Sequence, residues 1–260
     1  MKTIKVLNEH PVINKFYNLL NSTSRSNWET YCDFLQLSID SLISDFSAEH
    51  PREQDYMQIL SRYNRDDAKR FSEMFGCIMA YMAETNSECL SQIWEGVAAN
   101  ANFGQFFTPW NISIMMAKMQ MDDINWSNYS PLNKYLICDP SCGGGRTLAA
   151  SINFVPIDKI DCVCCHGVDI DLNVCHISAL NMLFLNANSF IIHGDSLSLT
   201  AWHVFQTIHT PFGGEIYEIS DPIEMKKIIT QAFSRSQPTE KNQVLKNNIQ
   251  EDLFYEERNC

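Results

Sequence analysis

The chain has 260 residues and a formal charge of −12, from 31 acidic and 19 basic side chains. Its hydrophobic content of 45% and mean hydropathy of −0.19 are typical of a globular protein with one large or two small domains. The sequence has no apolar run of about 18 residues and no apolar leader after Met1, so we expect no membrane segment and a cytoplasmic protein with reduced cysteines. The acidic charge argues against autonomous binding to nucleic acid, because phosphate contacts need Lys and Arg.

The first part of the chain, residues 12–103, is predicted to be helical. Apolar side chains recur at spacings of three and four in three stretches, residues 28–46, 66–85 and 88–99. Pro51 and the polar run around it separate the first two stretches. Stripes of this kind are typical of helix packing, so we expect a helical domain over residues 1–103 with no chemistry of its own.

From residue 104 onward, short apolar runs alternate with helical patterns. The expected strands are residues 135–139, 161–170, 189–193 and 204–208, and the expected helices are residues 111–121, 146–153, 172–186 and 224–233. Strands that alternate with helices predict a parallel sheet wound in βαβ units. We therefore expect an α/β domain over residues 104–222, followed by a C-terminal helix and a polar tail over residues 223–260.

Acidic and glycine residues end three of the predicted strands. Asp139-Pro140-Ser141-Cys142-Gly143-Gly144-Gly145 follows the first strand, Asp169-Ile170 ends the second, and Asp195-Ser196 ends the third. In an open parallel sheet, ligands bind at the carboxyl ends of strands, near the point where the strand order reverses. A glycine turn alone is equally typical of a plain strand–helix connection. With an acid at the next strand end, where a ribose diol is held, a nucleoside-containing ligand is favoured.

These residues resemble a known family. Gly104-Gln105-Phe106-Phe107-Thr108-Pro109 is similar to the GQFFTP element of adenine-N6 DNA methyltransferases, especially the modification subunits of type I restriction–modification systems. The loop that begins at Asp139 is similar to the family's DPxCGxG loop. The resemblance implies an α/β fold in which an N-terminal helical domain precedes a truncated Rossmann-like sheet of S-adenosylmethionine-dependent methyltransferase type.

The resemblance also implies the roles of individual residues toward S-adenosylmethionine. Gln105, Phe107 and Thr108 would contact the methionine part, with Asp139, Cys142 and Gly143 lining the same pocket. Asp169 would hold the ribose and Ile170 would cover the adenine, whose edge Asp195 and Ser196 would meet.

The family's catalytic signature, Asn-Pro-Pro followed by Tyr or Phe, is altered in this chain. The nearest string is His209-Thr210-Pro211-Phe212, which begins 14 residues after Asp195. By the resemblance, His209 or the Thr210 carbonyl would accept the hydrogens of adenine N6 and Phe212 would stack on the base. A histidine accepts through one ring nitrogen, with a reach different from that of an amide oxygen. We therefore expect methyl transfer that is degraded, as in a pseudoenzyme, or that depends on a partner.

The chain is also short for the family. Only 46 residues follow Gly214, so seven strands are not expected and part of the base-binding cleft would have to come from another chain. The resemblance implies a specificity subunit or a second modification subunit as that partner, with DNA bound weakly or through it. The alternative is a non-catalytic protein that pairs with or interferes with a restriction–modification complex. Methylation of a small molecule or a protein stays open.

Four residues, Cys162, Cys164, Cys165 and His166, form a cluster that invites a zinc site. Side chains that alternate along a strand point to opposite faces, and no second cysteine pair lies at zinc-finger spacing. We expect buried, reduced cysteines and no metal.

Overall fold

The computed structural model describes residues 10–43, 52–85, 87–98 and 107–234. The helical region contains α2 (Pro11–Asn21), α3 (Asn27–Leu42), α4 (Glu53–Leu60), α5 (Arg65–Thr85) and α6 (Leu90–Ala98). The three predicted helical stretches are confirmed as α3, α5 and α6, with ends that differ from the predicted bounds by one or two described residues. The three stretches left out α2 and also α4, which occupies part of the polar run after Pro51.

Local chemistry and aromatic packing define the helical region. The Ser26 side chain accepts from the Glu29 backbone N–H and donates to the Glu29 carboxylate at 2.8 Å, a reciprocal cap that starts α3. The Tyr31 hydroxyl donates to the Leu90 carbonyl at 2.7 Å and ties α3 to α6. Because α3 and α6 also contact α9 (Leu172–Phe184), the core of the helical region continues into the α/β region.

The sheet has five strands in the order β1-β2-β3-β4-β5. They are β1 (Tyr135–Asp139), β2 (Val163–Asp169), β3 (Ser189–Asp195), β4 (Thr200–Ile208) and β5 (Glu215–Ile219). The first three strands are parallel, and the links between them carry α8 (Arg146–Ile152) and α9. This half of the sheet confirms the predicted βαβ winding.

The prediction of an all-parallel sheet was wrong for the second half. β4 runs antiparallel to β3, and β5 runs antiparallel to β4. Residues 196–199 are the whole connection from β3 to β4. A parallel crossover needs about a dozen residues, so a link this short forces the chain to turn straight back.

The strand order does not reverse anywhere in the sheet, contrary to the expected switch point. β1 is therefore an edge strand, paired among the described residues with β2 alone. At the opposite edge, Ile43 of the helical region forms an isolated bridge with Ile216 of β5.

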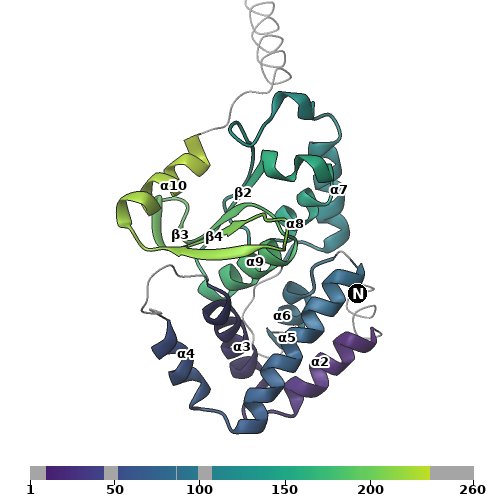
Figure 1. Cartoon of the computed structure of the whole chain (residues 1–260), viewed down its shortest axis with the longest axis vertical. Helices are drawn as coiled ribbons and strands as arrows, with labels where there is room; N and C mark the ends of the chain where they lie inside the picture. Colours follow the sequence, from purple (N-terminus) through teal and green to yellow (C-terminus); the bar gives the residue numbers. More distant parts are fainter. Residues whose placement is uncertain (1–9, 44–51, 86, 99–106, 235–260) are drawn as a thin grey trace, which may run out of the picture.

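Helices cover both faces of the sheet (Figure 1). One face packs against α9 and the helical region through residues such as Cys165, Ile191 and Phe205. The other face packs against α10 (Pro222–Ser234) through a smaller cluster, Val168, Ile192, Val204, Ile228 and Ile229. Beside β1, α7 (Trp110–Met121) packs on α8. Short 3-10 helices precede β1 and β2, at Trp126–Asn128 and Ile157–Cys162.

Candidate functional site

The site is built around the glycine turn between β1 and α8. Gly143 has a φ of 51° and Gly145 a φ of 75°, a left-handed backbone conformation that residues other than glycine rarely adopt. A side-chain carbon added to Gly143 would lie 2.8 Å from the Phe107 ring. The glycines therefore let the backbone turn sharply while an aromatic ring rests against it.

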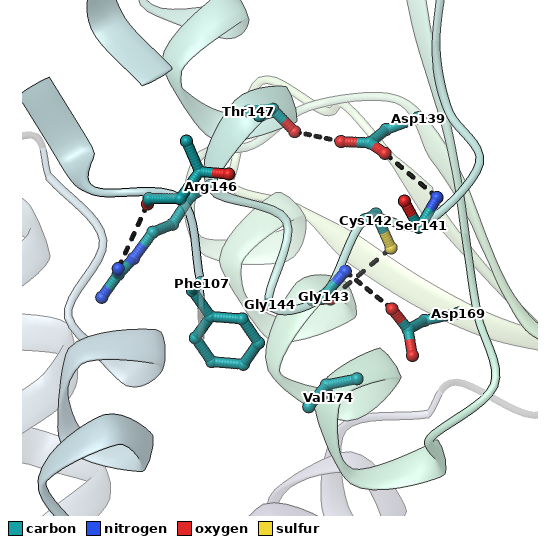
Figure 2. A pocket seen from close by; sticks show the side chains of 11 residues that line it. Phe107, Asp139, Ser141, Cys142, Gly143, Gly144, Arg146, Thr147, Asp169 and Val174 are labelled. Carbon is teal, nitrogen blue, oxygen red and sulfur yellow. Dashed lines mark hydrogen bonds between the residues drawn. The ribbon is translucent and has the colours of Figure 1, made fainter. Parts of the chain in front are cut away.

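Two carboxylates flank this turn. Asp139 accepts from the Ser141 backbone N–H at 3.1 Å and from the Thr147 hydroxyl. Asp169 accepts from the Gly143 backbone N–H at 2.9 Å, which ties the end of β2 to the glycine turn (Figure 2). β1 and β2 are parallel neighbours, so the two acids lie side by side at the carboxyl ends of these strands.

A cavity of about 190 Å³ opens between these groups. It is lined by eleven residues: Phe107, Thr108, Asp139, Ser141, Cys142, Gly143, Gly144, Arg146, Thr147, Asp169 and Val174. Burial, together with Asp169 and Asp139, holds the pKa of Cys142 well above its usual value, so this residue lines the cavity as a neutral thiol. The cavity combines carboxylate acceptors, a backbone turn in close contact and one aromatic face.

Arg146, the first residue of α8, connects the cavity wall with the helical region. Its guanidinium donates to Glu88 at 2.7 Å and to Glu95 at 2.9 and 3.1 Å. Burial alone would lower the pKa of Arg146, but the two carboxylates raise it. Arg146 is therefore a fixed cation within an otherwise acidic region.

Most of the predicted cofactor residues come together. Phe107, Thr108, Asp139, Cys142, Gly143 and Asp169 all line the cavity. Gln105 lies outside the described residues. Ile170, Asp195 and Ser196 follow or end β2 and β3 at the same sheet edge, but none of them lines the cavity. The Ile170 side chain is 68% exposed, and Asp195 accepts from Leu197 and Ser198 in its own turn.

The tetrapeptide His209-Thr210-Pro211-Phe212 does not reach the cavity. It follows β4, whose Thr207 pairs with Ser189 at the start of β3, whereas Thr200 pairs with Asp195 at the end of β3. Six residues of strand separate these positions, or about 20 Å at roughly 3.3 Å per residue. The predicted catalytic placement therefore fails because β4 runs antiparallel.

Hydrogen bonds fix this tetrapeptide at the amino ends of the parallel strands. The His209 ring lies 2.8 Å from the Asn186 carbonyl, and the Thr210 backbone N–H donates to the Asn186 side chain at 3.0 Å. The Phe212 side chain is fully exposed. The tetrapeptide therefore lies beside the α9–β3 turn.

Sequence reasoning did not assign five of the lining residues, Ser141, Gly144, Arg146, Thr147 and Val174. Ser141 and Gly144 lie within the recognised motif, which was the available signal. Arg146 is one of only four basic residues in residues 104–222, and an isolated cation next to a glycine turn was a second signal. Val174 carried no signal, because it depends on how α9 packs beside the turn.

The cysteine cluster is buried within the sheet and the turn before it. Cys162, Cys164 and Cys165 are free thiols, and burial lowers the pKa of His166 to about 4. Among residues 10–43, 52–85, 87–98 and 107–234, no group of three or more metal-ligating side chains is placed to hold an ion. In the same ranges, no helix has the length and apolarity to cross a membrane.

Residues 88–245 match the model of a family described as N-6 DNA Methylase. The match includes α6, the glycine turn and the whole sheet. Searches of the curated proteins and of the solved structures gave no match.

Proposed function

Since the chain belongs to the N-6 DNA Methylase family, we propose that it binds S-adenosylmethionine in the cavity at the ends of β1 and β2, and that methyl transfer to adenine N6 depends on a partner chain. Cofactor binding is supported by the convergence of Asp139, Asp169 and the glycine turn on one cavity. Dependence on a partner is supported by the distance of the His209 tetrapeptide from that cavity.

The chemistry of the cavity suits this cofactor. S-adenosylmethionine supplies an electrophilic methyl group on a sulfonium, and it also carries an ammonium and a ribose diol. Asp139 and Asp169 are acceptors suited to the ammonium and the hydroxyls, and the Phe107 ring that lines the cavity is of a kind that attracts a cationic group. Arg146 adds no unpaired positive charge, because Glu88 and Glu95 neutralise it.

The partner dependence rests on what this chain lacks near the cavity. Among the described residues that line the cavity, none carries a side-chain amide, and Phe107 is the one aromatic ring. β1, which ends at the cavity, pairs with β2 alone among the described residues, and an unpaired strand edge is a template for a strand of another chain. We propose a specificity subunit or a second modification subunit of a type I restriction–modification system as this partner.

A second candidate is a non-catalytic protein that pairs with or interferes with such a complex. The net charge of −12 and the displaced tetrapeptide favour it. The two candidates differ in one result: only the first predicts that a complex containing this chain loses methyl transfer when its cofactor cavity is disabled.

Calorimetry with S-adenosylmethionine and its demethylated product tests the cavity. Asp169→Ala should weaken binding by about 1.5–3 kcal/mol, because a hydrogen bond to a charged group is lost. Asp161→Ala is the matched control, since Asp161 is an exposed carboxylate near the opposite end of β2 and should leave the affinity unchanged. Absence of binding by the parent chain, or equal affinity in Asp169→Ala, would sink the proposal.

A further inference from the structure

Arg146 is almost completely buried, although its side chain is charged and lines the cavity. Its side chain is 5% exposed, and its inner partner Glu88 is fully buried, while Glu95 is 24% exposed. Both carboxylates belong to the helical region, Glu88 just before α6 and Glu95 within it. A buried ion pair is a poor way to gain stability alone, because desolvation offsets most of the attraction.

The same guanidinium also holds the chain segment that covers the glycine turn. It donates to the Thr108 carbonyl at 3.2 Å and lies over the Phe107 ring, with its central carbon 5.7 Å from the ring centre. In Figure 2 the Phe107 ring stands between Arg146 and the glycine turn. Both Phe107 and Thr108 line the cavity.

One planar cation therefore joins three parts of the molecule: α6, the start of α8 and the Phe107–Thr108 segment. A lysine could not do this, since a single ammonium cannot match two carboxylates and a carbonyl with the spread of a guanidinium fork. We propose that Arg146 is a positioning residue, which fixes Phe107 and Thr108 over the glycine turn and so couples the helical region to cofactor affinity. This inference rests on the proposed function.

A second buried arginine provides a matched control. Arg52 is 12% exposed, bridges Asp40 at 2.7 Å and Glu218 at 2.6 Å, and lies 5.7 Å from the centre of the Phe205 ring. It therefore repeats the chemistry of Arg146, but none of its partners lines the cofactor cavity. Arg52→Lys reports the cost of disturbing a buried two-carboxylate arginine elsewhere in the fold.

The experiment is a double-mutant cycle read by calorimetry with S-adenosylmethionine. Arg146→Lys should weaken binding about tenfold, the low end of what loss of an orienting partner costs in metal sites. Arg52→Lys should change the affinity by less than about twofold at a similar loss of thermal stability. In a Phe107→Ala background the effect of Arg146→Lys should shrink to less than about threefold, because the group it positions is gone.

The binding measurements can overturn the inference. Equal weakening by Arg52→Lys would mean that general destabilisation lowers the affinity. An undiminished effect of Arg146→Lys in the Phe107→Ala background would mean that Arg146 acts on the cofactor by another route. If Arg146→Lys does not fold, Glu95→Gln keeps Arg146 and Glu88 in place and should weaken binding in the same direction, whereas unchanged affinity would count against the inference.

Hydrogen exchange separates this inference from the proposed function. Without any ligand, Arg146→Lys should speed amide exchange at Thr108 and in the first turn of α7, and Arg52→Lys should not. If the parent chain fails to bind S-adenosylmethionine, the proposed function fails, and this exchange result still decides whether Arg146 positions the segment. Unchanged exchange in Arg146→Lys would refute the positioning itself.

Discussion

At Gly144 the glycine turn passes between two helices that belong to different parts of the chain. Its carbonyl accepts from Ser91 of α6 at 3.3 Å and from Asn181 of α9 at 2.9 Å. A side-chain carbon at this position would come closer than 3.0 Å to both the Ser91 hydroxyl and Ile177. Gly144 thus allows α6, the turn and α9 to meet without a gap.

Gly144→Ala should lower the free energy of unfolding by about 1–3 kcal/mol, because the added methyl overpacks this junction. Gly76→Ala is the matched control: Gly76 lies within α5, and an added carbon there meets no atom within 4 Å. That variant should gain about 0.5–1 kcal/mol from higher helix propensity. Denaturant titration measures both, and equal stability of the two variants would show that the junction relaxes freely.

His176 is a second residue whose surroundings predict a measurable property. It is 1% exposed, packs edge-on against Phe205, and neither ring nitrogen has a hydrogen-bond partner in the described residues. Burial, with a further contribution from Arg52, lowers the pKa of His176 to about 3. The unfolded chain therefore binds a proton near pH 6.5 that the folded chain does not bind, so stability falls as the pH drops below 6.5.

Between pH 7 and pH 5, His176 should cost the protein about 2 kcal/mol of unfolding free energy. His176→Leu should remove this part of the pH dependence and should be equally or more stable at pH 7, because a buried group without partners is replaced by an apolar one. Unfolding titrations at both pH values measure the difference. His166 gives a similar loss in both proteins, so a residual slope in the variant is expected, but an unchanged slope would contradict the assignment.

The direction of β4 decides what can be repaired by mutation. Converting His209 to Asn and Thr210 to Pro restores the residue types of the family's signature. The restored residues still lie at the ends of the strands that are opposite the cavity. Proline at position 210 also removes the backbone N–H that donates to Asn186 at 3.0 Å, a loss of about 1 kcal/mol. We expect no methyl transfer to adenine-rich single-stranded or duplex DNA from this double variant, measured with radiolabelled S-adenosylmethionine. Robust transfer would mean that the tetrapeptide reaches the cavity after all.

The positions of elements with a local sequence pattern could be predicted. The directions of strands, which depend on how elements are connected and packed, could not. The runs 135–139 and 189–193 were identified because they are apolar and end in acids or glycine, and the structure places strands there. β5 was missed although Glu215–Ile219 contains two isoleucines and a tyrosine, residue types that favour strands, directly after two glycines. The direction of β4 was set by the length of the link before it, which the pattern of apolar residues does not contain.

The same distinction applies to the cavity. The motif residues Asp139, Gly143 and Asp169 were found because strand ends meet at one edge of a parallel sheet. Arg146 carries a sequence signal as an isolated cation beside the turn, but its partners, like the position of Val174, depend on how α6 and α9 pack there. The boundary expected at residue 103 lies outside the described residues and stays a prediction.

On the scale of the whole molecule, charge governs the encounter with DNA. With a net charge of −12 and four basic residues between 104 and 222, the chain can release few counterions from a duplex. We expect a dissociation constant weaker than about 10⁻⁶ M at about 0.15 M salt, within or above the usual non-specific range. Fluorescence anisotropy tests this, and submicromolar binding by the chain alone would revive an autonomous DNA enzyme.

Because the strands lie in the sheet in the same order as in the chain, every strand pairs with the one made just before it. No later strand has to insert between two earlier ones, and the turns from β3 to β5 form by short-range closure. This order lets the sheet grow strand by strand during synthesis, although the parallel pairs from β1 to β3 close over longer links than the antiparallel pairs from β3 to β5. β1 is the first strand of the described sheet to be made, and within that sheet one of its sides stays unpaired from the start of assembly to its end.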